Sequence, residues 1–395
     1  MSNFMKKNTK LIHQKRIELL NENKSLISPI YQSVKFSFPS IEEGLKAEDT
    51  YGNQFEYSRV SNPTVRELEL MLADLQDKED SICVSSGMAS IWLSMLGNLK
   101  SGDCVLYFLE SYQPTRVMLK KFLRNFGIES IALSIRDFDS IKNTLSRKEV
   151  KMLIFESPTN PMLQIPDIEK LVFLAKENSV ITIMDNTWAG LHNHGQFGID
   201  YFIHSLTKYA SGHGDVMGGA VISSSKNIKK IKPLAVNMGS ILDPATAYLI
   251  MRGLKTYHLR VDRHETNAFK IANFLKNRSE VKKVFYPGLE DDDGYNLAKK
   301  QMKSYGGVVT FHLDCNKDKA WNFINSLKLF TTASSLGSPE SLVIPAHLFF
   351  TKDFNKKEIS LSGIQDSTIR LSLGLEDIDD LIFDLSEAFD RIFKL

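Results

Sequence analysis

Short apolar segments that can form strands alternate with helical sequence along much of the first 210 residues of this 395-residue chain. One helix is expected to begin at Asn62-Pro63, and another to end near Phe126 with Gly127 as its stop. Parallel strands need crossover connections of this kind, whereas antiparallel strands can be joined by short hairpins. The alternation therefore predicts an α/β fold with a mostly parallel sheet, whose expected strands are 82–84, 104–108, 152–155, 180–184 and 201–204.

The pattern divides the chain into three parts. Residues 1–60 have too little periodic apolar sequence to bury a core and are predicted to form an N-terminal arm. Residues 61–255 carry the alternating pattern of a large domain. Residues 256–395 are predicted to form a smaller α+β domain, with long helical sequence at its start, strands at 281–285, 308–313 and 368–373, and a closing helix from Asp377.

Composition restricts the classes of function. Lys and Arg number 49 against 47 Asp and Glu, so bulk charge gives no reason to expect nucleic acid or an anionic membrane as partner. No apolar run approaches the ~18 residues of a membrane-spanning helix, and the basic N-terminus lacks the apolar stretch of a secretory signal. Three cysteines cannot form a disulfide framework, which fits a reducing compartment. A soluble cytoplasmic protein is therefore expected.

Two polar side chains follow apolar runs in the segment 181–219. Asp185 closes one run, and Lys208 follows the next within Ser205-Leu206-Thr207-Lys208. Ligands bind at the carboxyl ends of strands in open α/β sheets, so this carboxylate and amine could face one crevice. Taken singly, the aspartate is better explained as a loop cap and the lysine as a solvated side chain. The hydroxyls of Ser205 and Thr207 favour a site, because they can bind an anionic group while the amine reacts with a carbonyl.

A second anion site is indicated at residues 85–88 (SSGM), where a strand is expected to turn into a helix. Backbone N–H groups and the helix dipole favour phosphate there, and Gly87 allows close approach, although small residues at such turns also serve packing alone. Tyr112 could stack on a planar ring, although a core or rim tyrosine would show the same pattern. His192 and His194 have no partners at metal-ligand spacing, so no metal site is predicted.

A phosphate site, a stacking aromatic ring, a carboxylate for a ring nitrogen and a Schiff-base lysine are together what pyridoxal phosphate (PLP) requires. The chain resembles the Cys/Met-metabolism family of fold-type I PLP-dependent enzymes, with a large domain and a smaller C-terminal domain. That family contains cystathionine β-lyase, cystathionine γ-synthase, cystathionine γ-lyase and methionine γ-lyase. The resemblance runs from about Ile30 to the C-terminus, in the blocks Tyr57-Ser58-Arg59 with Asn62-Pro63-Thr64, 85–89, 156–161, 185–219, 335–337 with 340–342, and 370–372 with 374–377.

The resemblance implies roles at the cofactor. Lys208 would bind PLP covalently and act in catalysis, Asp185 would pair with the pyridinium nitrogen, and Tyr112 would stack on the ring and assist catalysis. The residues expected at the phosphate within the same chain are Gly87, Met88, Ser205 and Thr207.

The resemblance also implies an oligomer and a substrate site. In this family the Tyr-x-Arg pair, here Tyr57 and Arg59, reaches the phosphate of a neighbouring subunit, and Tyr57 would also be catalytic. This implies an obligate dimer, usually doubled to a homotetramer. Arg370 would bind the α-carboxylate of an amino-acid substrate, with Asn160 and Ser335 assisting, because a planar guanidinium suits bidentate binding.

Within the family, the residues favour cystathionine β-lyase. The segment 185–189 (DNTWA) and Tyr112-Gln113-Pro114 resemble the β-lyase versions. Methionine γ-lyases carry Tyr-Gly-Cys in place of Tyr112-Gln113-Pro114. Ser334 replaces the Glu that is typical of cystathionine γ-lyase, but Leu336 replaces the Trp of some β-lyases, so γ-synthase and the γ-lyases remain alternatives. The expected reaction is β-elimination of L-cystathionine to homocysteine, pyruvate and ammonia, in methionine biosynthesis, with weak alanine racemisation as a side activity. A non-catalytic member would be expected to lack Lys208 or Arg370.

Overall fold

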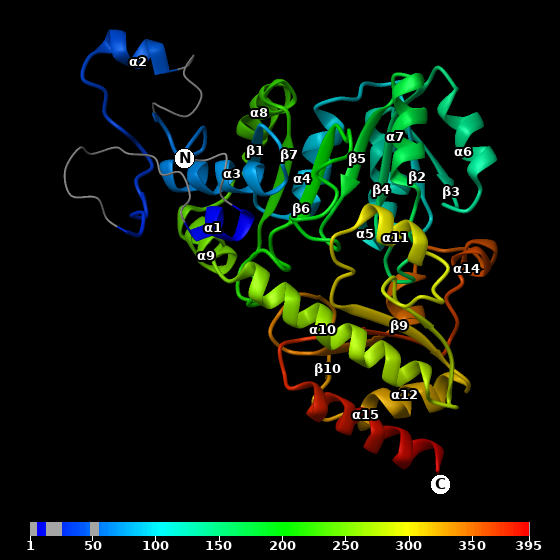
Figure 1. Ribbon diagram of the computed structural model, residues 1–395. Coiled ribbons are helices and arrows are strands. Elements are labelled where there is room, and N and C mark those ends of the chain that lie inside the picture. Colours follow the sequence, from blue (N-terminus) through cyan, green and yellow to red (C-terminus); the bar gives the residue numbers. More distant parts are fainter. Residues whose placement is uncertain (1–5, 13–25, 48–54, 395) are drawn as a thin grey trace.

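Two β-sheets organise the computed structural model, which describes residues 6–12, 26–47 and 55–394 (Figure 1). The larger sheet has the strand order β1-β7-β6-β5-β4-β2-β3, and the smaller one has the order β10-β11-β12-β9-β8. The strands of the larger sheet are β1 (Asp80–Val84), β2 (Cys104–Phe108), β3 (Glu129–Leu133), β4 (Val150–Glu156), β5 (Ile181–Asp185), β6 (Tyr201–Ser205) and β7 (Gly219–Ser223).

The larger sheet is mostly parallel, as the sequence predicts. Strands β3, β2, β4, β5 and β6 pair in parallel, and only β7 runs against its neighbours β6 and β1. No helix separates β6 from β7, so the chain cannot make the crossover that a parallel pair would need. The segment between these two strands contains Lys208, which therefore lies just beyond the carboxyl end of β6.

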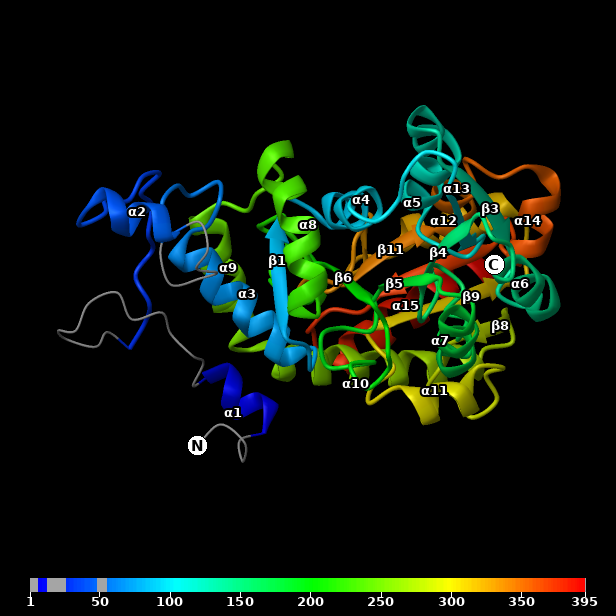
Figure 2. The ribbon, with the colours of Figure 1, turned by 90° about the horizontal axis from the view of Figure 1, so that it is seen from above.

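Helices cover both faces of the larger sheet and bury its apolar strands in two core layers. In Figure 2, α3 and α8 lie on opposite sides of β1. One layer contains α3 (Pro63–Leu75), α6 (Phe138–Leu145), α7 (Ile168–Glu177) and α9 (Pro244–Leu254). The other contains α4 (Gly87–Leu96), α8 (Ser225–Met238) and the π-helical and 3-10 turns at 118–126, which follow α5 (Gln113–Val117).

Local sequence explains where these helices begin and end. Asn62 caps α3, its side chain accepting a hydrogen bond of 2.9 Å from the Thr64 N–H, and Pro63 occupies the first helical position. Gly127 has a φ of 69° and ends the turns after α5, as expected from its sequence.

The C-terminal part has its own sheet and its own core. Helix α10 (Tyr257–Lys276) leads from α9 along this sheet, and α12 (Lys317–Ser326) and α15 (Ile378–Phe393) pack beside it (Figure 1). Helices α11 (Tyr295–Gln301), α13 (Ala346–Phe350) and α14 (Lys356–Ser362) lie in the connections. The strands are β8 (Val281–Phe285), β9 (Val308–Leu313), β10 (Thr331–Thr332), β11 (Leu342–Pro345) and β12 (Thr368–Ser372). The expected α/β fold with a smaller C-terminal part is confirmed, while the boundary at residue 255 stays a prediction.

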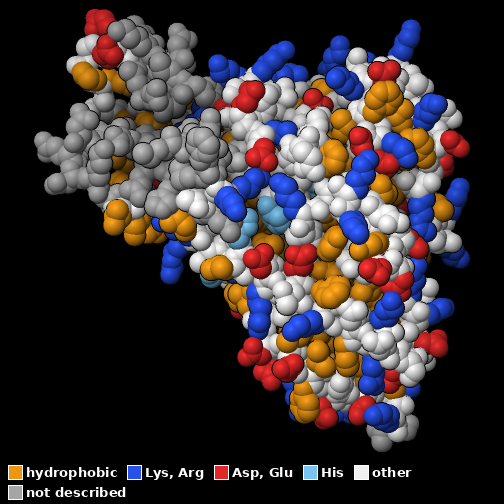
Figure 3. Space-filling model, viewed as in Figure 1, with side chains coloured by type: hydrophobic (Ala, Val, Ile, Leu, Met, Phe, Trp, Pro, Cys, Tyr) orange, Lys and Arg blue, Asp and Glu red, His pale blue; other side chains and the backbone are white. Residues whose placement is uncertain are grey.

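Of the expected arm, the structure describes residues 6–12, 26–47 and 55–60. They include α1 (Lys7–Ile12), α2 (Ile41–Ala47) and a bridge between Lys35 and Tyr57. Among the described residues, no helix is both long enough and apolar enough to cross a membrane. On the face shown in Figure 3, basic and acidic side chains are interspersed, in line with the formal charge of +2.

Candidate active site

A cavity of about 440 Å³ lies where β4, β5 and β6 end, and residues of the C-terminal part form its other wall. Its position agrees with the rule that ligands bind at the carboxyl ends of strands in such sheets. Ten of the twelve predicted site residues line it: Gly87, Met88, Tyr112, Asn160, Asp185, Ser205, Thr207, Lys208, Ser335 and Arg370.

Asp185 is the last residue of β5, and its partly buried side chain lines the cavity. The Thr187 N–H donates to its Oδ1 at 3.1 Å. Burial raises the pKa of Asp185, and the hydrogen bonds from Thr187 offset part of this rise. A partly buried carboxylate of this kind is stabilised in its ionised form by a cationic partner, so the site suits a protonated ring nitrogen.

Lys208 enters the cavity from the connection after β6. Its Nζ donates a hydrogen bond of 2.7 Å to Ser335 Oγ. Burial lowers the pKa of Lys208, and the positive charge of Arg370 lowers it further. A lysine with a lowered pKa has a larger neutral fraction, and the neutral amine is the form that attacks carbonyl groups and accepts protons.

Ser335 connects the lysine to the arginine. Its φ of 137° is unusual for a residue with a side chain, and such strained positions persist where the surrounding contacts fix them. Its hydroxyl accepts from Lys208, and its carbonyl oxygen accepts from Arg370 Nη2 at 2.9 Å. The strained serine therefore sets the spacing between the amine and the guanidinium.

Arg370 lies on β12 and is 4% exposed. Its Nη1 donates to Asn160 Oδ1 at 3.2 Å, and its Cζ lies 5.4 Å from the centroid of the Trp188 ring and 5.1 Å from that of Phe350. Burial lowers its pKa to about 10, so it remains charged at neutral pH. Within the described part of the chain, its Nε has no hydrogen-bond partner and no carboxylate pairs with it. Such a group suits the carboxylate of a ligand.

The N-terminus of α4 forms a cradle beside Ser205. The Ser86 side chain accepts from the Ala89 N–H at 3.1 Å and so caps the helix. A Cβ atom on Gly87 would lie 2.8 Å from Ser205 Cβ, so only glycine fits this close approach. Thr207 Oγ1 accepts from the Gly218 N–H at 3.1 Å, which holds its hydroxyl at the cavity. The helix N-terminus and these hydroxyls suit a phosphate group.

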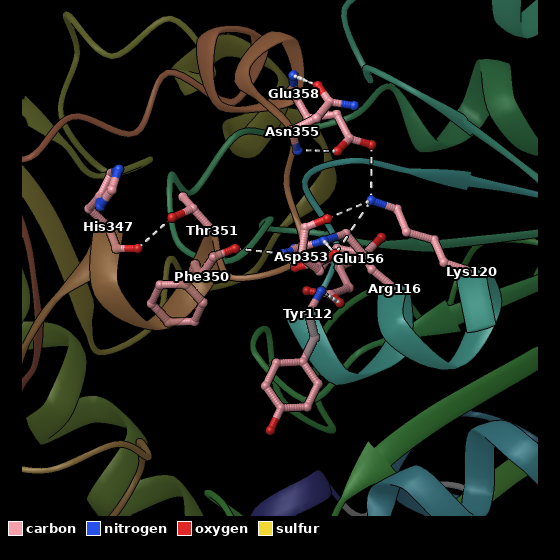
Figure 4. Close-up of polar contacts among 11 residues, drawn as sticks. Tyr112, Arg116, Lys120, Glu156, His347, Phe350, Thr351, Asp353, Asn355 and Glu358 are labelled. Carbon is pink, nitrogen blue, oxygen red and sulfur yellow. Dashed lines mark hydrogen bonds and ion pairs between the residues drawn. The ribbon is translucent and has the colours of Figure 1, made fainter. Parts of the chain in front are cut away.

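Tyr112 precedes α5 and points its ring away from the polar cluster in Figure 4. Its backbone N–H donates to Glu156 Oε1 at 2.5 Å. Glu156 ends β4 beside Asp185, and burial together with the Asp185 charge raises its pKa well above the usual range. Glu156 is a site residue that the sequence could have indicated, because it ends its strand as Asp185 does.

Tyr57 and Arg59 do not line the cavity of their own chain. Arg59 Nη1 donates to the Val236 carbonyl oxygen at 2.9 Å, and its Cζ lies 5.6 Å from the centroid of the Tyr57 ring. Their expected role at a neighbouring subunit stays a prediction. The cavity also has lining residues for which the sequence analysis assigned no role, among them Thr187, Trp188, Met217, Phe349, Phe350 and Lys352.

A family model described as "Cys/Met metabolism PLP-dependent enzyme" matches residues 8–390. The chain belongs to this family. It is a PLP-dependent carbon–sulfur lyase, and PLP is its cofactor. The family and the fold type expected from the sequence are thereby confirmed.

Similar proteins include several activities. L-methionine gamma-lyase of Fusobacterium nucleatum subsp. nucleatum is 36% identical over 373 residues, which cover 93% of this chain and 94% of that protein. Cystathionine beta-lyase of Lactococcus lactis subsp. cremoris is 37% identical over 370 residues, covering 92% and 93%. Cystathionine gamma-lyase of Bacillus subtilis is 36% identical over 392 residues, covering 98% and 100%. Because these identities are similar, they support the chemistry that the family shares but do not distinguish its individual reactions.

Solved structures share the fold over almost the whole chain. Cystathionine gamma-lyase from Lactobacillus plantarum, in complex with L-serine, has a TM-score of 0.90 and 33% identity, covering 98% of this chain and 99% of that one. A Campylobacter jejuni protein described as an O-acetylhomoserine (thiol)-lyase has a TM-score of 0.90 and 31% identity, covering 98% and 100%. The latter contains N'-pyridoxyl-lysine-5'-monophosphate.

The cavity residues fit PLP on their own chemistry. Asp185 is a partly buried carboxylate of raised pKa that a ring N–H⁺ would stabilise, and Lys208 supplies an amine of lowered pKa. Gly87 leaves open a space that a Cβ would fill, next to hydroxyl groups suited to phosphate. The carboxylate, the amine and the phosphate cradle thus occur together in one cavity, as the cofactor requires.

Proposed function

We propose that this enzyme is a cystathionine β-lyase, which cleaves L-cystathionine by β-elimination to homocysteine, pyruvate and ammonia. The linkage of Lys208 Nζ and the Arg370 guanidinium through one residue, Ser335, supports the chemistry at Cα, and the β-lyase-like segments 185–189 and 112–114 carry the choice of β-elimination. An α-amino acid whose carboxylate is bound by Arg370 would present its Cα close to the amine of Lys208. The positions of Lys208 and Arg370 therefore suit removal of the Cα proton by the lysine amine.

The residues divide the work as follows. The chemistry that PLP supplies when bound is an electron sink for negative charge at Cα. Asp185 holds a proton at the ring nitrogen, and Arg370 orients the substrate through its α-carboxylate. Lys208 accepts the Cα proton, after which the bond between Cβ and sulfur breaks and the electron pair leaves with the sulfur. Protonation of that sulfur gives the thiol of homocysteine, and hydrolysis of the remaining three-carbon unit gives pyruvate and ammonia.

The β-elimination requires proton removal at Cα alone, whereas γ-elimination also requires proton removal at Cβ. Lys208 suffices for the first, and its hydrogen bond to Ser335 fixes its amine in one position. The β-lyase-like sequence at Asp185–Ala189 contains Trp188, whose ring centroid lies 5.4 Å from Arg370 Cζ. The γ-lyases and γ-synthase remain the alternative, since proteins with those names are similar over the same residues.

The test is incubation of purified, PLP-loaded protein with L-cystathionine and separate quantification of the 2-oxo acids. The proposal predicts pyruvate and homocysteine in equal amounts. Formation of 2-oxobutyrate and cysteine would show γ-elimination and overturn it. Absence of any 2-oxo acid, together with turnover of O-acyl-homoserine and cysteine to cystathionine, would indicate a γ-synthase.

A further inference from the structure

Arg116 is the centre of a buried cluster that joins α5 to the segment 350–358 of the C-terminal part (Figure 4). The side chain is 1% exposed, and its Nη2 and Nε donate to the two carboxylate oxygens of Asp353 at 2.7 and 3.1 Å. Nη2 also donates to the Phe350 carbonyl oxygen at 2.6 Å, and Nη1 donates to that of Ser111. A single guanidinium therefore holds a carboxylate and two backbone carbonyls, which suits its planar, five-donor geometry.

Further contacts hold the same segment. Lys120 Nζ lies 2.9 Å from Glu358 Oε1 and 3.5 Å from Asp353 Oδ2. The Phe354 ring lies against Arg116, with 4.1 Å between the ring centroid and Cζ. Burying a charged pair is costly unless its hydrogen bonds are satisfied, and here the arginine and the carboxylate each have several partners. The cluster is thus a built anchor rather than a surface ion pair.

The anchored segment forms part of the cavity wall. The carbonyl of Phe350 is bound by Arg116, while the ring of the same residue packs on Arg370. Lys352 lines the cavity and lies in sequence between Phe350 and Asp353, both of which bind Arg116. Arg116 also contacts the part of the cavity wall expected to hold the cofactor ring. Its backbone N–H donates to the Tyr112 carbonyl oxygen at 3.1 Å, and Tyr112 lines the cavity. Neither Arg116 nor Asp353 lines the cavity itself.

We propose that Arg116 and Asp353 latch the segment 346–354 over the cavity and thereby place Lys352 to bind a carboxylate at the distal end of the substrate. The inference rests on the proposed function, since L-cystathionine is an L-amino acid thioether whose far end carries a second carboxylate, and it assigns a residue to that end. In the described part of the chain, Lys352 has no ion pair, and its Nζ lies 5.6 Å from the centroid of the Phe349 ring. Arg116 is a positioning residue, whereas Lys352 determines specificity.

Two substrates separate the distal contact from the chemistry. L-Cystathionine has a distal carboxylate, whereas β-chloro-L-alanine has a leaving group on Cβ and no distal carboxylate. For Lys352→Met, the KM for L-cystathionine should rise about tenfold, the loss expected for one charge-assisted hydrogen bond, with kcat little changed. The KM for β-chloro-L-alanine should stay unchanged. Equal changes for both substrates, or none for either, would overturn the assignment of Lys352.

The latch is tested with Arg116→Lys and Asp353→Asn. Lysine keeps the charge but cannot hold Asp353 and two carbonyls at once, so both variants should raise the KM for L-cystathionine more than that for β-chloro-L-alanine. Amide hydrogen exchange across 346–354 should also be faster in both. Asp293→Asn is the matched control, because Asp293 forms an exposed ion pair with Lys283 and neither residue lines the cavity, and it should leave both KM values unchanged.

The outcomes distinguish the inference from the function on which it rests. Unchanged exchange across 346–354 in Asp353→Asn and Arg116→Lys would overturn the latch whatever the substrate, because this readout needs no turnover. If Arg116→Lys does not fold, Asp353→Asn decides alone. A wild-type enzyme that converts β-chloro-L-alanine but not L-cystathionine would instead overturn the proposed function.

Discussion

Replacing Gly87 by Ala should weaken PLP binding without unfolding the protein. The added Cβ would lie 2.8 Å from Ser205 Cβ and 3.1 Å from Ser205 Cα, so it meets the end of β6 rather than a flexible side-chain tip. Carbon atoms pack at about 3.5–4.0 Å, so the N-terminus of α4 must move from β6 by roughly 0.7 Å. A hydrogen bond of about 2.9 Å would then stretch to about 3.6 Å, beyond useful length.

The expected loss follows from the bonds that the phosphate would lose. A hydrogen bond to a charged group contributes about 1.5–3 kcal/mol, so the loss of one bond raises the Kd for PLP about tenfold to hundredfold. Titration of cofactor-free protein with PLP, followed by the quenching of tryptophan fluorescence, measures this Kd. Overpacking should also lower the free energy of unfolding by about 1–3 kcal/mol, which thermal unfolding monitors separately.

Gly198→Ala is the control, because its added Cβ meets only Val172 Cγ1 at 3.6 Å, an ordinary contact. It should bind PLP as the wild type does. A Gly87→Ala protein that is folded and binds PLP within twofold of the wild type would refute the placement of the phosphate at this helix.

Four further outcomes are expected. Lys208→Ala should abolish turnover, because it removes the amine that accepts the Cα proton; a steady-state rate above the blank would contradict this. Burial and the Arg370 charge lower the pKa of Lys208, so Arg370→Met should raise that pKa and slow the labelling of Lys208 by acetic anhydride at pH 8 in cofactor-free protein; equal or faster labelling would speak against it. Mixing Lys208→Ala chains with Tyr57→Phe/Arg59→Ala chains should restore partial activity if one site uses both subunits, and no recovery after proven subunit exchange would place both residues in their own chain's function. L-Alanine in deuterated water should slowly give deuterated D-alanine, whereas label confined to L-alanine would exclude racemisation.

Periodicity in the sequence was enough to predict the larger sheet, since its central strands are short apolar runs buried on both faces. Two strands of this larger sheet are not predicted, for different reasons. In β3 most residues are only partly buried, which weakens the pattern. In β7, Gly219 begins the strand directly after a glycine-rich motif, so the motif obscures the start of the strand pattern.

The site was predictable where a residue follows a strand, as Asp185 does, or lies in a family motif, as Lys208 and Arg370 do. The cavity wall at Phe350 and Lys352 was not predictable from the sequence. It depends on a contact between residues 116 and 353, which are far apart in the sequence. A buried arginine such as Arg116 resembles any surface arginine until its partners are known. Long-range pairing of this kind leaves no local period in the sequence.

The most direct test of the account is to locate the cofactor in the protein. Reduction of the PLP-loaded enzyme with borohydride fixes the cofactor to the lysine that holds it, and peptide mapping by mass spectrometry then identifies that residue. A pyridoxyl group is expected on Lys208, in the peptide that follows β6. A pyridoxyl group on any other lysine, with Lys208 unmodified, would contradict the assignment of this cavity as the active site.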